Sequence, residues 1–424
     1  MTGAPGLATR EQLIHALHEA AELEQNLMCT YLYAAFSLKD AGEELNAEEE
    51  AAVKRWRRAI LDIAIDEMGH LAAVWNITAA VGGSPRVGRG NFPIDPGYLP
   101  AGVVVKLAPF SLDVLQHFIH LERPATADEP DGGGFEHAAF QRGRAASFLT
   151  PMSFDYDTVG EFYRTIEGSL AVMAGRLGEG GLFCGDPALQ LSPGEVGLKG
   201  AHVVRCSETA VAALAVIVTE GEGAPEGSPN CHFARFRQIL EEYRALLAKN
   251  PNFAPAHPAA VNPVLRRPPG ISGRIWIEDE ETASIVDLAN ATYQTVLRLL
   301  GYSYNVPSPD AEKRLAVGLG IGLMKAVTFL AESAARRPSG PSTPDCNGGM
   351  SFTALRDAAP LPHGTSTRRL FVERLQELSK RAGELDQVDP RLSHAAGLLQ
   401  GLAQRAEGFL AFNSAPVARS LVTA

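Results

Sequence analysis

Residues 53–81 read VKRWRRAILDIAIDEMGHLAAVWNITAAV, and apolar side chains recur along this stretch at steps of three and four residues. This spacing places them on one face of an α-helix and predicts that the face is buried. The face consists of Val53, Trp56, Ile60, Ile63, Glu67, His70, Val74, Ile77 and Val81. A carboxylate on a core face is costly unless it is paired or binds a metal. Glu67 and His70 are therefore candidate metal ligands, and a buried ion pair is the alternative interpretation.

A second seam of the same kind lies in residues 10–40, where Glu24 is the only charged member. Its members are Leu13, Leu17, Ala20, Glu24, Leu27, Tyr31, Ala34 and Leu38. The short polar segment DAGEELN joins the two stretches, which predicts an antiparallel helix pair. Glu24 lies 20 residues before Glu44 in this turn and Glu67 lies 23 residues after it, so the two should face each other. A Glu on one helix and Glu-x-x-His on its neighbour form half of a four-helix-bundle di-metal site.

The composition excludes several classes of protein. The chain has 424 residues and a net charge of −11, which argues against nucleic acid as the main partner. No apolar run reaches membrane-spanning length, and the first residues contain no apolar signal segment. The five cysteines are scattered without a C-x-x-C pair, which favours reduced thiols over disulfides or a zinc site. We therefore expect a cytoplasmic protein with no membrane partner.

The pattern along the chain predicts an all-α fold, a four-helix bundle followed by additional C-terminal helices. We expect a metal-binding bundle at 1–250 with an irregular insertion at 82–150, a Pro-rich connector at 251–270 and a C-terminal helical region at 271–424. Besides 10–40 and 47–81, helices are predicted at 111–122, 155–178, 201–222, 231–249, 280–302, 308–336, 366–386 and 390–412.

The third and fourth bundle helices should supply the other half of the site. Glu161 and Glu222 lie level with each other when counted from a turn near residue 190. The segment GEGAPEGSPN then breaks the fourth helix, because it holds three Gly and two Pro in ten residues. His232 opens the helix that follows. We expect the break to fold back so that Glu222 and His232 reach the same ion as Glu67.

Other residues compete for these roles. Glu167 lies on an apolar seam of the third helix, and Glu208 lies on one of the fourth. His117, His120 and Glu122 form a local cluster, in which the two histidines fit a solvated face or a supporting role better than metal ligation. Glu222 and His232 could equally be a solvated helix end and a surface residue at a helix start.

Six motifs in order resemble the ferritin-like domain family related to iminophenyl-pyruvate dimer synthases. They are AELEQNLMCTYLYAAFSLKD, AIDEMGHLAAVWNITAAVGGSP, FIHLERP, GEFYRTI, VTEGEG and CHFARF, within about residues 10–250. The resemblance implies metal ligands at Glu24, Glu67, His70, Glu161, Glu222 and His232, and so favours Glu161 over Glu167. The sequence departs from the family pattern at 25–30 and at Thr219-Glu220.

The resemblance implies a metal-dependent oxidative enzyme of secondary metabolism. Its substrate would be a small molecule, an amino-acid-derived imine or a related nitrogenous intermediate. Carboxylate and imidazole ligands suit one or two iron ions, with manganese as the alternative metal. No sequence motif speaks for or against a non-covalent haem, and a homo-oligomer is compatible with the pattern. The competing hypothesis is a ferritin-like protein that binds or handles iron without catalysis.

Overall fold

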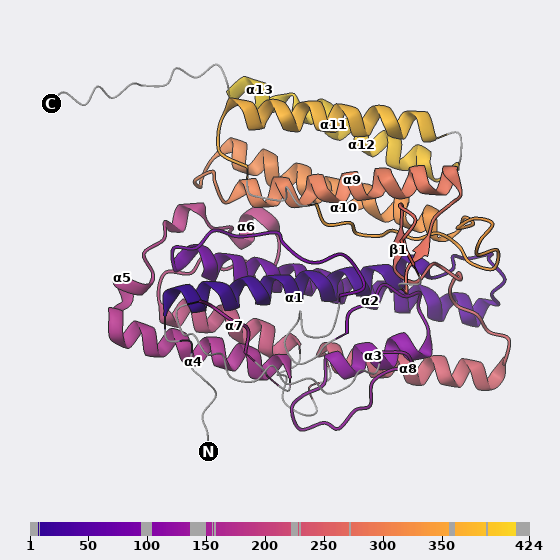
Figure 1. Ribbon diagram of the computed structural model, residues 1–424, viewed down its shortest axis with the longest axis horizontal. Helices are drawn as coiled ribbons and strands as arrows, with labels where there is room; N and C mark the ends of the chain where they lie inside the picture. The colour runs from indigo at the N-terminus through magenta and orange to yellow at the C-terminus, as the bar shows by residue number, and fades with distance from the viewer. Residues whose placement is uncertain are drawn as a thin grey trace.

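The computed structural model describes residues 7, 9–94, 104–135, 150–154, 156, 158–221, 228, 230–270, 273–355, 361–386 and 389–412. Helices account for nearly all regular structure in these ranges (Figure 1). The strands that they contain are β1 (Pro263–Val264) and β2 (Ile275–Trp276), which pair in parallel. The predicted all-α fold is confirmed.

The helices follow the predicted order. Those of the bundle region are α1 (Arg10–Ser37), α2 (Ala47–Ala80), α3 (Leu112–Leu121), α4 (Val159–Leu177), α5 (Glu179–Leu182), α6 (Pro193–Val196), α7 (Ser207–Glu220) and α8 (His232–Lys249), with the 3₁₀ turn η2 (Pro187–Leu189). Those of the C-terminal region are α9 (Glu280–Ser303), α10 (Ala311–Ala335), α11 (Thr365–Leu385), α12 (Leu392–Ala406) and α13 (Gly408–Ala411).

The long helices α1 and α2 form the central pair of the bundle. Each begins with a capping box, Thr9 with Gln12 in α1 and Asn46 with Glu49 in α2, in which side chains satisfy backbone N–H groups that have no partner within the helix. The seam predicted for each helix is buried along its length. The apolar periodicity therefore fixes which face of each helix turns toward the rest of the bundle.

The third and fourth helices of the bundle are each built from two pieces. α4 and α7 pack along one half of the central pair, and α3 and α8 lie together along the other half (Figure 1). α3 ends and α4 begins near the middle of α1, since Phe118 of α3 packs on Tyr31 while Tyr163 of α4 bonds Glu24. The chain breaks between α7 and α8 at the same level. Four helix ends therefore converge on the middle of the bundle.

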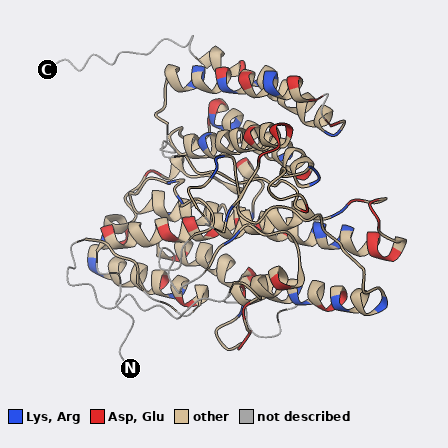
Figure 2. Cartoon of the chain, turned by 45° about the vertical axis from the view of Figure 1, so that its right-hand side comes forward, with Lys and Arg blue, Asp and Glu red and all other residues tan. Residues whose placement is uncertain are grey.

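The C-terminal helices cover the opposite side of the α1/α2 pair. α9 and α10 pack along each other, α10 contacts α1, and α11 with α12 forms an outer layer that carries many charged residues (Figure 2). In the described ranges α10 is the single helix long and apolar enough to cross a membrane, and 50% of its most apolar window is buried inside the protein. It packs against α1, α9 and α12.

Polar contacts also join the C-terminal helices to the turn between α1 and α2. Arg336 lies 2.8 Å from Asp40 and 3.2 Å from Glu43, and Arg391 lies 3.2 Å from Glu43. The connector runs beside α1, where the N–H of Lys39 donates to the carbonyl of Pro255. Buried side chains of both regions form one continuous core. The domain division at 251–270 therefore stays a prediction.

Candidate metal centre

Two groups of buried carboxylates and imidazoles lie in the middle of the bundle. The first, here called group one, is Glu24, Glu67 and His70, and the second, group two, is Glu67, Glu122 and His232. Within each group the candidate ligand atoms all lie within 4.8 Å of one another. No member is more than 2% exposed. Because Glu67 belongs to both, the two groups form one continuous site.

Group one is held by the two continuous helices. His70 Nδ1 lies 3.1 Å from Glu67 Oε2 and 3.4 Å from Glu24 Oε2. The i and i+3 positions of Glu67 and His70 project both side chains from one face of α2. Glu24 meets them from α1, at the height that the count from the turn predicts.

Group two is held by helix ends. Glu122 is the C-cap residue of α3, and His232 is the first residue of α8. His232 Nδ1 lies 3.0 Å from Glu67 Oε1 and 3.5 Å from Glu122 Oε1. The first residue of α8 therefore lies beside Glu67.

A further shell of polar residues surrounds the two groups. Tyr163 donates a hydrogen bond to Glu24, and Tyr31 donates one to Glu122. Glu220, the last residue of α7, places Oε2 3.4 Å from His70 Nε2. Each group therefore has one tyrosine that orients its outer carboxylate.

A family model of the ferritin-like proteins matches residues 17–241, the range that contains both groups. The chain belongs to the ferritin-like family. Its bundle core holds carboxylate and histidine side chains, the residue types from which the ferritin-like di-metal proteins build their sites. The resemblance drawn from the six motifs is confirmed.

Two curated relatives extend the match into the C-terminal region. Over 377 residues the chain is 25% identical to a 2-imino-3-(indol-3-yl)propanoate dimerase of Chromobacterium violaceum, covering 81% of this chain and 34% of the relative. Over 416 residues it is 25% identical to a dichlorochromopyrrolate synthase of Lentzea aerocolonigenes, covering 90% of this chain and 39% of the relative. The chain thus spans between a third and two fifths of the length of these relatives.

A solved structure of a ferritin-like protein from Caulobacter vibrioides is also similar. Its TM-score is 0.47 at 17% sequence identity, and the match covers 77% of this chain and 94% of that one.

Burial and neighbouring charges shift the pKa values of four residues of the ferritin-like site: Glu24, Glu67, His70 and His232. Burial and the charge of Glu67 raise the pKa of Glu24 to about 8. Burial favours the neutral form of Glu67, but His70 and His232 outweigh it and lower its pKa well below the usual range. Burial opposes charge on both histidines, yet the carboxylates, led by Glu67 at His70 and by Glu122 at His232, raise the pKa of each. Protons on Glu24 and the histidines thus offset the carboxylates unless a cation takes their place.

The hydrogen bonding of the site fits metal ligation. Within the described residues, Glu24 Oε2, His70 Nε2 and both ring nitrogens of His232 have no hydrogen-bond partner. His232 Nδ1 lies 3.0 Å from Glu67 Oε1, but the two atoms lack the geometry of a hydrogen bond. Buried polar atoms are normally hydrogen-bonded. Atoms that are close together but not bonded to each other are suited to face a common ion.

The other predicted ligands have mixed outcomes. Glu222 lies outside the described residues. Glu161 is half-buried in the first turn of α4 and is a member of neither group. Glu167 is also half-buried, and Glu208 is exposed. The metal role of Glu161 and Glu222 stays a prediction.

Sequence reasoning named Glu122 only as a member of the competing cluster with His117 and His120, and it missed Glu220 as a site residue. The buried face of α3 runs through Leu115 and Phe118, and a further step of four reaches Glu122, so the rule that found Glu24 would have found this residue. Glu220 follows Ile217 on the buried face of α7. Residues 210–218 read AVAALAVIV, so all faces of this helix are apolar in sequence. The pattern therefore does not show which face is buried, or that Glu220 lies on it.

Proposed function

We propose that this ferritin-like chain is a metal-dependent oxidative enzyme of secondary metabolism that acts on a small amino-acid-derived imine or a related nitrogenous intermediate. The observation that carries the proposal is the pair of buried carboxylate–histidine groups that share Glu67. The two curated relatives support the substrate class, because one is named for an indole-bearing imine and the other for a chromopyrrolate.

The residues of the site suit iron, with manganese as the alternative. Glu24, Glu67 and Glu122 would offset the charge of the ions, while His70 and His232 would bind as neutral imidazoles. Glu67 would serve both ions, since it is the member common to the two groups. Iron bound there would supply oxidation chemistry with dioxygen or peroxide.

The surrounding residues hold the site in place and keep it dry. The hydroxyls of Tyr163 and Tyr31 fix the orientation of Glu24 and Glu122, and such supporting hydrogen bonds tune metal ligands. In the metal-free protein Glu24 holds a proton near neutral pH because its pKa is about 8, and a bound cation would displace this proton. Burial of all five ligand candidates excludes bulk water and strengthens their electrostatic interactions.

The experiment combines metal analysis with a substrate assay. Protein reconstituted anaerobically with ferrous iron should retain one or two ions per chain after desalting. An imine formed in the same tube by an amino-acid oxidase acting on tryptophan should then be consumed, with an oxidised or coupled product detected by mass spectrometry. The Glu67→Gln variant is the matched control. Retained iron without any imine consumption would favour the iron-handling hypothesis instead, and no retained metal would overturn both.

The remaining expectations belong to the same proposal. We infer that the substrate is a small molecule and that the protein is cytoplasmic. We also infer a homo-oligomer, and light scattering tests the oligomeric state.

A further inference from the structure

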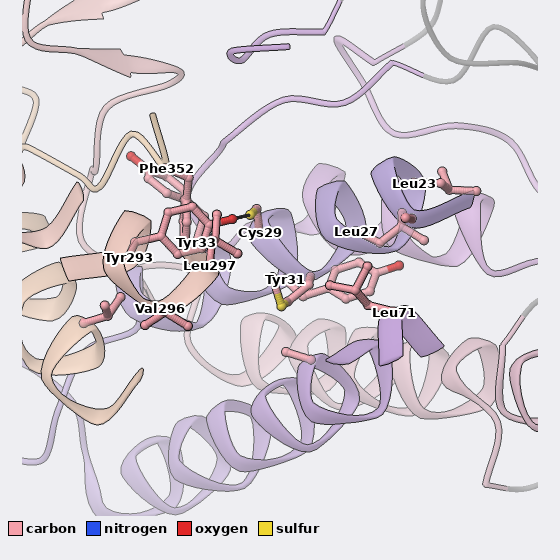
Figure 3. Packing of buried hydrophobic residues seen from close by; sticks show 14 of the residues in the cluster. Leu23, Leu27, Cys29, Tyr31, Tyr33, Leu71, Tyr293, Val296, Leu297 and Phe352 are labelled. Atoms are coloured by element: carbon pink, nitrogen blue, oxygen red, sulfur yellow. Dashed lines mark hydrogen bonds between the residues drawn. The ribbon is translucent and has the colours of Figure 1, made fainter. Parts of the chain in front are cut away.

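An apolar cavity lies on the side of the α1/α2 pair that faces the C-terminal helices. Its volume is about 390 Å³, within the range of small-molecule sites. It is lined by side chains of α1, α2, α9 and α10 and by the segment that follows η2. Figure 3 shows Tyr293, Val296 and Leu297 of α9 and Leu71 of α2, four of the lining residues, from close by.

The cavity is separate from the metal centre. No member of group one or group two lines it. Met28 and Leu71 are buried, line the cavity and lie one helical turn from Glu24 and Glu67. A ligand in the cavity can therefore be examined without any metal in the protein.

The lining favours a flat aromatic body. Met28, Met68 and Met324 contribute flexible thioethers, which adapt to irregular shapes and make favourable contacts with aromatic rings. Tyr293 adds a buried ring. Two apolar side chains at the rim are open to solvent, Ile65 at 48% and Ile321 at 36% exposure, which marks the entrance.

The polar groups of the cavity favour an acceptor on the ligand. Lys325 is the charged member of the lining and is exposed, and it has no ion-pair or hydrogen-bond partner among the described residues. Trp75 also lines the cavity and is only 3% exposed. Its indole N–H has no hydrogen-bond partner among the described residues. Among the described residues, the lining contains unpartnered donors and no carboxylate. An anionic oxygen group on the ligand would complement such donors.

We propose that this cavity is a binding site for a flat aromatic carboxylate, with the rings among the methionines and the carboxylate toward Lys325. The site is distinct from the metal centre and does not depend on the proposed function.

The test uses 2-naphthoate with the full chain, both metal-free and iron-loaded, in isothermal titration calorimetry. One molecule should bind per chain. Ile321→Trp should abolish binding by filling the entrance, and Ile65→Trp, at the other exposed apolar position of the rim, is the second blocking variant. Lys325→Met should weaken binding about two- to fivefold, the effect of one exposed charge pair. Arg314→Met is the matched control, because it removes an exposed positive charge from α10 away from the cavity.

Separate measurements test where 2-naphthoate binds and whether its carboxylate is recognised. Bound 2-naphthoate should quench tryptophan fluorescence, and most of this quenching should be lost in Trp75→Phe. Neutral 2-naphthamide should bind more weakly than the acid and should not respond to Lys325→Met. The proposal is overturned if folded protein binds no 2-naphthoate, if blocked variants that keep the wild-type melting temperature bind it normally, or if quenching survives Trp75→Phe. Stronger binding of decanoate, or a dimer that buries the cavity and excludes the probe, would overturn it as well.

Discussion

The two groups of the candidate metal centre share Glu67 but are built in different ways. Group one stands on α1 and α2, which run unbroken through the site. Group two takes Glu122 from the C-cap of α3 and His232 from the first turn of α8, so two of its members lie at helix ends. Group one is therefore fixed by helix periodicity alone, whereas group two also depends on how the long segments between helices pack. We expect group one to be the stiffer half and group two the half that adapts to a substrate.

The largest expected effect comes from the residue that the two groups share. Glu67→Gln should lower the retained iron to less than about a tenth, because both groups lose a ligand. Glu67→Ala should do the same and should also destabilise the fold by roughly 3 kcal/mol, since it leaves buried histidines without their partner. Elemental analysis and thermal melts measure the two effects. Glu208→Gln, an exposed carboxylate on α7, is the control. Full iron retention in Glu67→Gln would show that the groups are ion-pair networks.

A smaller effect should separate the two groups. Glu24→Gln and Glu122→Gln should each remove about half of the iron, if each group holds one ion. Glu161→Gln and Glu167→Gln should leave the iron content near the wild-type value, because neither residue belongs to a group. Elemental analysis of the four variants decides the matter. Loss of iron in Glu161→Gln together with full retention in Glu122→Gln would mean that the ligand set implied by the family resemblance is right and the geometric assignment of Glu122 is wrong.

The difference between the groups also explains what could be predicted from sequence. Glu24, Glu67 and His70 interrupt long seams that alternate clearly with polar residues, so the phase of each helix is readable. Glu122 follows a short helix, and the steps from Leu115 and Phe118 lead to it, so it could have been predicted by the same rule. The aromatic and methionine lining of the cavity comes from helices far apart in the sequence, and their packing against each other cannot be read from local patterns. The all-α fold was predictable because it depends on periodicity alone.

A third effect concerns the tyrosines that orient the outer carboxylates. Tyr163→Phe should weaken iron binding about tenfold through Glu24, and Tyr31→Phe should do so through Glu122. If group two is the more adaptable half, Tyr31→Phe should have the smaller effect, because its carboxylate can find another orientation. Competition with a chromophoric chelator measures both affinities. Tyr243→Phe, in the aromatic cluster with Trp56, serves as the control. Equal losses in the two variants would remove the distinction in stiffness.

The smallest effect is a pH dependence that belongs to group one. Burial and the charge of Glu67 raise the pKa of Glu24 from 4.5 to about 8. Between these values the folded, metal-free protein binds a proton that the unfolded chain has released, so the contribution of Glu24 to stability is complete below pH 4.5 and is lost as the pH rises to about 8. The free energy of unfolding should therefore fall by at most about 1.4 kcal/mol per pH unit across this window. Glu24→Gln cannot ionise and should flatten the curve in urea titrations with a chelator present at pH 5.5, 6.5 and 7.5. Glu122→Gln is the matched variant from group two. Parallel curves for wild type and Glu24→Gln would show that Glu24 is already ionised in the metal-free protein, and group one would then carry its full negative charge before any metal arrives.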